Sequence, residues 1–289
     1  FIISTLILCL IGFYEKITGF NPYSVLPVFH DTMDYALEQQ EREGGLRVKA
    51  SFDHAISFGA YLVMILPIIL YKFKENFTLF SVFLGLITLA VLTTISRSAI
   101  IGVLITLAFF WLFVERKYLS VLIFMILFVF CLYFQAFSQY LYLLNPFTTK
   151  SEVLASSSFT RINQFSKGFD ILRNYPVFGT GSKSGIFELI IDNYYLTFVI
   201  HFGLLGFVTF VNSLVNIIVK PVYYIINGLI RDKLFIALSI GIMNFYIMLF
   251  IVSLMSFHYV FWIYAGLIAR LIFNYNNDTK EALKEKNKR

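Results

Sequence analysis

Eight stretches of nearly unbroken apolar residues divide the chain, with polar segments between them. A bilayer core about 30 Å thick takes roughly 20 apolar residues of helix to cross, and backbone polar groups inside it must be paired within the segment. The pattern therefore predicts an all-α, polytopic integral membrane protein with about eight transmembrane helices in this chain. The first stretch is short, and we expect further spans to precede it. The apolar stretches are 1–13, 54–72, 77–95, 98–115, 118–137, 194–219, 234–253 and 256–273.

Composition agrees with a lipid environment. Of the 289 residues, 58% are hydrophobic and only 14% are charged, whereas soluble domains carry about 25% charged residues. The surface of a larger soluble protein would still have to meet water, so this excess excludes an ordinary soluble domain. Cys9 and Cys131 both lie within apolar stretches, and we interpret them as packing residues without a disulfide or metal-ligand spacing.

Charge gives the predicted spans a direction. The net charge is +6, and short cytoplasmic loops of membrane proteins are enriched in Lys and Arg. Four basic sites fall on one side when the eight spans are followed in order, and we assign that side to the cytoplasm. This assignment places loops 14–53 and 138–193 outside, in a single transmembrane domain (1–273) followed by a basic cytoplasmic tail (274–289). The basic sites are Lys72/Lys74, Arg116/Lys117, Lys220/Arg231/Lys233 and the tail.

The second outer loop contains a predicted amphipathic helix over 161–173. Ser158 or Thr160 would cap its beginning, and Pro176 would end it. Spacing puts three apolar side chains on one face, with Arg161 and Lys167 elsewhere. These apolar side chains are Phe165, Phe169 and Leu172.

Glycines follow this helix at 179, 181 and 185, and they allow the backbone to turn sharply and approach a ligand. A helix and turn of this kind at a membrane surface suit an anionic amphiphile. An interfacial helix that only anchors the loop is an equally good interpretation of the residues.

Three polar residues stand at predicted outer ends of spans. Asp192 opens one span; the helix dipole favours an acid there as an N-cap, and a carboxylate at the membrane boundary is also able to accept a proton. The residues alone favour the capping role. Arg97 has almost no loop around it, and its planar fork suits phosphate, although snorkelling to headgroups is the alternative. His54, at the start of another span, is interpreted as a hydrogen-bonded structural residue, and His201, further inside the span that Asp192 opens, as a helix-contact residue.

Several function classes lack sequence support. The chain has no HExxH, no paired Cys/His set and no P-loop, so we expect no metal, no cofactor and no nucleotide-driven transport. The Gly-x-Gly at 179–181 follows no predicted strand and is too short to indicate a dinucleotide site.

Three segments together resemble the O-antigen ligase/polymerase superfamily, the Wzy and WaaL type of membrane glycosyltransferase. The resemblance runs from about Ser51 to Phe210. It rests on the order and spacing of the motifs and on their shared side of the membrane. The matching residues are Ser96-Arg97-Ser98 with Gly102, Arg161, Tyr175-Pro176-Val177-Phe178-Gly179-Thr180-Gly181, and Asp192-Asn193-Tyr194-Tyr195-Leu196 with Gly203 and Gly206.

One departure bears on the branch of this superfamily. The ligase branch has a histidine, taken as catalytic, where this chain has Asp192, and its Arg-x-x-x-Leu motif reads Arg161 to Phe165 here. Asp-Asn in place of His-Asn looks more like the polysaccharide polymerase branch.

The resemblance implies a GT-C-like, metal-independent membrane glycosyltransferase in a bacterial inner membrane, with its active face outside. It would polymerise undecaprenyl-diphosphate-linked oligosaccharide repeat units for surface polysaccharide. Its partners would be this lipid-linked substrate, the bilayer and a chain-length regulator, with no nucleic acid. Arg97 and Arg161 would stabilise the leaving diphosphate and Asp192 would activate the acceptor hydroxyl. Further expected substrate contacts are Lys167, Arg173, Gly179, Gly181, Lys183 and Asn193.

Three alternatives remain at this point. An O-antigen ligase or protein O-oligosaccharyltransferase would transfer the glycan to a different acceptor. A lipid-linked glycan flippase or transporter is disfavoured because the charges gather at one face and not within the spans. A non-catalytic assembly subunit would tolerate loss of all three outer residues.

Overall fold

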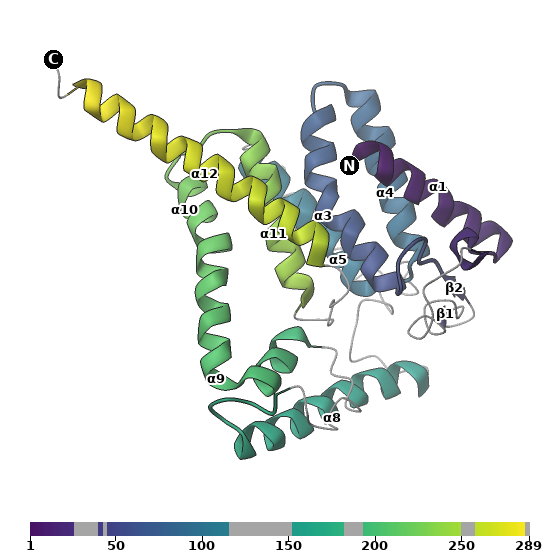
Figure 1. Cartoon of the computed structure of the whole chain (residues 1–289). Helices are drawn as coiled ribbons and strands as arrows, with labels where there is room; N and C mark the ends of the chain where they lie inside the picture. The colour runs from purple at the N-terminus through teal and green to yellow at the C-terminus, as the bar shows by residue number, and fades with distance from the viewer. Residues whose placement is uncertain (26–39, 43–44, 116–151, 182–192, 250–257, 287–289) are drawn as a thin grey trace.

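The computed structural model describes residues 1–25, 40–42, 45–115, 152–181, 193–249 and 258–286. Apart from one short antiparallel strand pair, the regular structure in these ranges is helical (Figure 1). The main helices are α1 (Ile2–Thr18), α3 (Ala55–Phe73), α4 (Phe77–Thr93), α5 (Arg97–Phe109), α8 (Glu152–Asn174), α9 (Tyr194–Leu214), α10 (Lys220–Ile226), α11 (Lys233–Leu249) and α12 (His258–Lys286). The strands are β1 (Gln40–Arg42) and β2 (Gly45–Arg47).

Helices occupy seven of the eight predicted apolar stretches, and the remaining stretch, 118–137, lies outside the described residues. Two of the helical segments are long and apolar enough to cross a membrane, Ala55–Phe73 and Tyr194–Ile226. The helices Phe77–Thr93, Ser98–Val114 and Lys233–Leu249 are apolar but shorter. The helical class is thus confirmed, and the count of eight spans stays a prediction.

Two boundaries differ from those expected from the sequence. The loop helix begins at Glu152, so the predicted start near Ser158 or Thr160 is wrong and both residues lie inside α8. The helix ends at Asn174, two residues before Pro176, as predicted. At the other end of the chain, α12 continues past the expected tail boundary at 273 to Lys286, because neither Gly nor Pro interrupts the sequence there.

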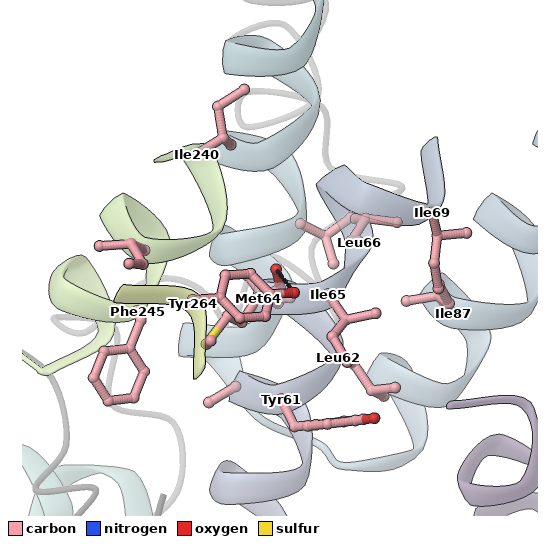
Figure 2. Close-up of a cluster of buried hydrophobic side chains, with 14 of the residues drawn as sticks. Tyr61, Leu62, Met64, Ile65, Leu66, Ile69, Ile87, Ile240, Phe245 and Tyr264 are labelled. Carbon is pink, nitrogen blue, oxygen red and sulfur yellow. Dashed lines mark hydrogen bonds between the residues drawn. The ribbon is translucent and has the colours of Figure 1, made fainter. Parts of the chain in front are cut away.

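Helix α3 forms the centre of the bundle and packs against α4, α5 and α11. Its buried side chains interlock with those of its neighbours in the cluster of Figure 2. Close helix approach depends on small residues: a Cβ placed on Gly241 of α11 would lie 2.5 Å from the Met64 carbonyl oxygen of α3. The Tyr264 hydroxyl of α12 donates to that same oxygen at 3.2 Å, so three helices meet at one backbone position.

Basic turns gather at one end of this bundle, where α3 joins α4 and where α11 begins (Figure 1). A side-chain hydrogen bond with Lys74, together with burial and the like charge of Lys74, lowers the pKa of Lys233, while Glu115 and Glu75 raise it. Lys74 and Lys233, which belong to two of the predicted basic turns, are therefore close to each other. Arg116 and Lys117 of a third turn lie outside the described residues, and the assignment of these turns to the cytoplasmic side stays a prediction.

Candidate active site

The end of the bundle opposite the basic turns carries the predicted site segments. Arg97 is the first residue of α5, Arg161 lies within α8 and Asn193 immediately precedes α9. Figure 1 shows α8 lying across the bundle at this end, beside the beginning of α9. Asp192 and Lys183 lie outside the described residues, so their side chains are not placed.

Helix α9 is broken at Gly203, where φ is 65° and ψ is −171°. A continuous helix would pair the amides of Leu204 and Leu205 with the carbonyls of Ile200 and His201. Instead these two amides donate to the carbonyls of Pro176 and Val177, at 2.9 and 3.1 Å. The orphaned carbonyls of Ile200 and His201 accept from the amides of Thr180 and Gly181, at 2.8 and 3.0 Å.

The segment Pro176–Gly181, which we call the glycine turn, thus replaces the hydrogen bonds that α9 loses at its break. Unpaired buried backbone groups are costly, and four such groups are satisfied by this exchange. The glycine turn and Gly203 are therefore two halves of one structure, although they are separated in sequence. The sequence predicted that this turn could approach a ligand closely. In the structure the turn closely approaches the backbone of α9 at its break.

Glycine is required on both sides of this contact. A Cβ on Gly179 would lie 2.5 Å from the amide nitrogen of Gly203, and a Cβ on Gly203 would overlap the carbonyl of Val177. Both residues also have positive φ, 70° for Gly179 and 65° for Gly203, where side chains are strained. Gly181 has a φ of 65° as well, but a Cβ there would meet nothing within 4 Å.

The break folds the two parts of α9 toward each other. Phe198 and Phe210 would be about 18 Å apart along a straight helix at 1.5 Å per residue, yet their rings stack with centroids 4.7 Å apart. Tyr194 and Tyr195 contact Phe210 as well, at 5.9 and 5.7 Å. The apolar stretch 194–219 is consequently not the single straight span that its hydropathy predicts.

Helix α8 packs on the first part of α9 through its smallest residue. A Cβ on Gly168 would lie 2.9 Å from Leu196 and 3.0 Å from Ile200, and Gln164, one turn earlier, is buried on the same side. The predicted substrate contacts Lys167 and Arg173 are exposed. Arg173 pairs with Asp170 at 3.5 Å between two well-exposed side chains, an interaction of little consequence for stability.

Asn193, and not Asp192, is the N-cap of α9. Its side-chain oxygen accepts from the Leu196 amide at 3.0 Å, and its carbonyl accepts from the Thr197 hydroxyl at 3.0 Å. The capping role that the sequence favoured for Asp192 is therefore wrong, and residue 192 is the position directly before the cap. His201 bonds through Nδ1 to the Thr197 carbonyl of the same helix at 2.8 Å, and its role as a helix-contact residue stays a prediction.

Two serines that flank Arg97 in the sequence shape the turn before α5. Ser96 and Ser98 are buried and their hydroxyls lie 3.0 Å apart. Gly102, one turn later, packs on α3, where a Cβ would lie 2.8 Å from a Val63 methyl group. The flanking residues of this motif thus fix the start of α5. His54 similarly caps α3 by accepting from the Ile56 amide at 3.0 Å, as its structural interpretation requires.

Arg47 is a cation at this turn that the sequence did not single out. Its Nε donates to the Thr94 carbonyl at 3.1 Å, and the amide of Val48 donates to the Thr93 carbonyl at 3.2 Å. The end of β2 is therefore fastened to the turn that carries Arg97. Arg47 lies in a charged stretch of the first outer loop, and that stretch gave no signal that distinguished it from a solvated surface.

A buried carboxylate on α1 also holds the segment that joins β2 to the turn before α5. Glu15 of α1 is only 3% exposed, and its Oε2 accepts from the amides of Ala50 at 2.8 Å and Lys49 at 3.3 Å. Ala50 has a φ of 49°, a strained conformation that this pairing supports. Glu15 thus anchors the segment 46–50 that reaches the Arg97 turn.

We expect Glu15→Ala to destabilise the protein, because two buried amides would lose their acceptor at a cost of about 1–3 kcal/mol each. Glu15→Gln retains an acceptor oxygen and should lose much less. Lys16→Ala is the matched control, since its bond to the Leu46 carbonyl (2.7 Å) is exposed. Thermal unfolding of the three variants in detergent tests this order, and equal melting temperatures for the alanine variants would contradict it.

No curated protein and no solved structure matches the chain. Residues 80–211 match the model of a family described as O-antigen ligase. This match, over a little less than half of the chain, supports membership of the O-antigen ligase/polymerase superfamily. The match begins within α4 and ends within α9, and it includes the Arg97 turn, α8, the glycine turn and Asp192-Asn193. The expected resemblance from Ser51 to Phe210 begins earlier than this match.

The family match supports a function of O-antigen ligase or polymerase type in general, and the family suggests a membrane context and a lipid-linked glycan substrate. The glycine turn and Gly203 both lie within the matched residues, and each completes the other's backbone hydrogen bonds. Within the described residues, no cluster of three or more His, Cys, Asp or Glu could hold a metal ion.

Proposed function

We propose that this protein polymerises oligosaccharide repeat units carried on undecaprenyl diphosphate, on the outer face of the bacterial plasma membrane. The observation that carries the proposal is Asp192-Asn193 in place of the His-Asn pair of ligases. Asn193 caps α9, so residue 192 stands next to the positive end of a helix. The dipole there favours the charged form of an acid, which is the form that a base must have.

The reaction we assign to this site is displacement at an anomeric carbon. The acceptor hydroxyl oxygen forms a bond to that carbon while the bond from the carbon to the diphosphate oxygen breaks. The hydroxyl proton passes to Asp192, and the lipid diphosphate leaves with the bonding electrons. Arg97 and Arg161 stabilise the charge that develops on the leaving group, as fixed cations do in other transferases. The proposal assigns this positive charge to arginines and to no metal ion.

The other residues predicted to contact the substrate bind or shape the site and do not take part in the chemical step. Lys167, Arg173 and Lys183 attract the diphosphate, and a bidentate arginine gives it orientation. Asn193, Gly179 and Gly181 act through the shape of the site: Asn193 caps the beginning of α9, and the two glycines belong to the turn that packs on the break of α9 near Gly203. A chain-length regulator is an expected partner of a polymerase.

Purified protein incubated with lipid-linked repeat units tests the proposed reaction. A polymerase produces a ladder of products that differ by one repeat unit, without any added acceptor. Product that forms only on an added lipid A-core or protein acceptor would contradict polymerisation.

The second candidate is an O-antigen ligase, favoured by the match of residues 80–211 to a family of that description. It uses the same donor and the same leaving group but a different acceptor. The same incubation with and without acceptor separates these two functions.

A further inference from the structure

An exposed apolar surface extends from α8 across the glycine turn to the part of α9 that follows Gly203. Phe178, at the tip of the turn, is 75% exposed, and Phe169 is 54% exposed. Contiguous apolar surfaces of this kind mark contacts with another phase or molecule. We call this surface the aromatic ledge. It consists of Phe165, Phe169, Tyr175, Val177, Phe178, Phe202, Leu204 and Leu205.

The side chains of the ledge on α8 lie on a different face from the one that packs against α9. Helix α8 contacts α9 through Gly168 and Ile171, and Gln164, which shares their face by its three- and four-residue spacing, is buried. Phe165 and Phe169 each follow a contact residue by one position, which turns them about 100° away from α9. The phenylalanines predicted to share a face therefore do so, but on the side that the protein leaves open.

The ledge is continuous with the exposed apolar surface of α9 beyond Gly203. Beyond Gly203 the apolar side chains of α9 point outward, with Val208 65% exposed, and this helix belongs to a segment able to cross a membrane. The amides of Leu204 and Leu205 are bonded to Pro176 and Val177. The glycine turn is thus fixed at the level where the exposed surface of α9 begins, and Figure 1 shows α8 crossing that level.

The polar side of α8 fits the same environment. Asp170 and Arg173 are both well exposed, and Lys167 is exposed as well. A helix with aromatic residues on one side and basic residues on another lies in the plane of a membrane interface, with its apolar face at the boundary of the acyl chains. Lipid is therefore the one occupant that matches the ledge, its continuity with α9 and its charges.

We infer that α8 and the glycine turn lie within the membrane interface, with the aromatic ledge inserted among the lipids of one leaflet. The beginning of α9, and with it Asn193, is then held at headgroup depth. A lipid-linked diphosphate would reach this depth without leaving the bilayer. The inference concerns position in the membrane and holds for a polymerase and for a ligase alike.

Single tryptophan reporters in the whole chain test this position. Trp111 and Trp262 are replaced by phenylalanine, and Phe178→Trp or Asp170→Trp is introduced; Asp170 lies on the polar side of α8 and is the matched control. The protein is reconstituted in phosphatidylethanolamine/phosphatidylglycerol vesicles, with or without lipids brominated near the glycerol end of the acyl chains. Thermal unfolding confirms that both variants fold.

Bromolipids are expected to quench Phe178→Trp emission at least about twofold more strongly than Asp170→Trp emission, and its emission should lie at shorter wavelength. Aqueous iodide should show the reverse order. Iodide quenching of Phe178→Trp equal to that of Asp170→Trp, without bromolipid quenching, would overturn the inference. Quenching by neither agent would also overturn it, because a protein surface would then cover the ledge. None of these readouts depends on which glycan transfer the protein catalyses.

Discussion

Replacement of Gly203 by alanine is expected to abolish glycan transfer and to lower the thermal stability of the protein markedly. The added Cβ would overlap the Val177 carbonyl, so the glycine turn would have to move away from α9. Movement breaks up to four hydrogen bonds, each worth about 0.5–1.5 kcal/mol. The backbone conformation of Gly203, with φ 65° and ψ −171°, is essentially restricted to glycine and adds about 1–3 kcal/mol for any side chain, so the expected total is on the order of 3–9 kcal/mol.

Gly179→Ala should have the same effect, because a Cβ on Gly179 would clash with the backbone of α9 at Gly203. Two matched controls separate the clash from the cost of positive φ. Gly19 has a φ of 72° and Gly181 a φ of 65°, and neither Cβ would meet any atom within 4 Å. Gly19→Ala should retain activity, and both control variants should lose only about 1–2 kcal/mol. Thermal unfolding in detergent, together with the ladder assay, provides the measurement.

Equal destabilisation of Gly181→Ala and Gly203→Ala would contradict this account, since the two positions have the same φ and differ in their surroundings. The exchange of hydrogen bonds also predicts where damage spreads. Loss of the turn should loosen the packing of Gly168 on Leu196 and Ile200, because α8 leads directly into the turn. Hydrogen exchange of the α8 amides is expected to rise in Gly203→Ala and to stay low in Gly19→Ala.

Replacement of Asp192 by asparagine should reduce polymer formation by roughly 10²–10⁴-fold, the usual contribution of a general base. Asparagine has the size of aspartate but cannot take up the proton of the acceptor hydroxyl. Cells that carry the variant should accumulate single lipid-linked repeat units while long-chain polysaccharide disappears from gels. Asp192→Ala should give the same result, and Asp192→His should retain part of the activity because imidazole is also a base.

Asp53→Asn is the matched control for this series. Asp53 stands directly before His54, the N-cap of α3, just as Asp192 stands directly before Asn193, the N-cap of α9. Both acids therefore gain the same favourable interaction with a helix dipole, and only one is assigned to catalysis. Chains of normal length in the Asp192→Asn strain, or equal losses in both variants, would show that residue 192 is not the base.

Much of this protein follows from local sequence. Runs of apolar residues predict the helices, because a segment in an apolar medium must pair its own backbone groups and a helix does so within the segment. The end of α8 before Pro176 also has a local cause. The order of Arg97, Arg161, the glycine turn and Asp192-Asn193 led to the superfamily that the family match then confirmed. The roles of Arg97, Arg161 and Asp192 stay predictions.

Hydropathy could not reveal the break in α9, because the stretch 194–219 is apolar throughout. A glycine within an apolar helix is tolerated in many proteins, so Gly203 alone does not predict a break. The break becomes stable only when Pro176, Val177, Thr180 and Gly181 supply the four missing hydrogen-bond partners. A pattern confined to one segment contains no information about partners in another.

Arg47 and Glu15 show the same limit in the first outer loop. Charged residues in a loop usually point to water, and their sequence gives no other indication. In the structure Glu15 is buried under the segment 46–50, which fastens Arg47 to the Arg97 turn. The sequence by itself determined the helical, apolar character of this protein and the residues of its motifs. Tertiary structure alone decided how they meet, because the deciding hydrogen bonds join backbone groups that every residue possesses.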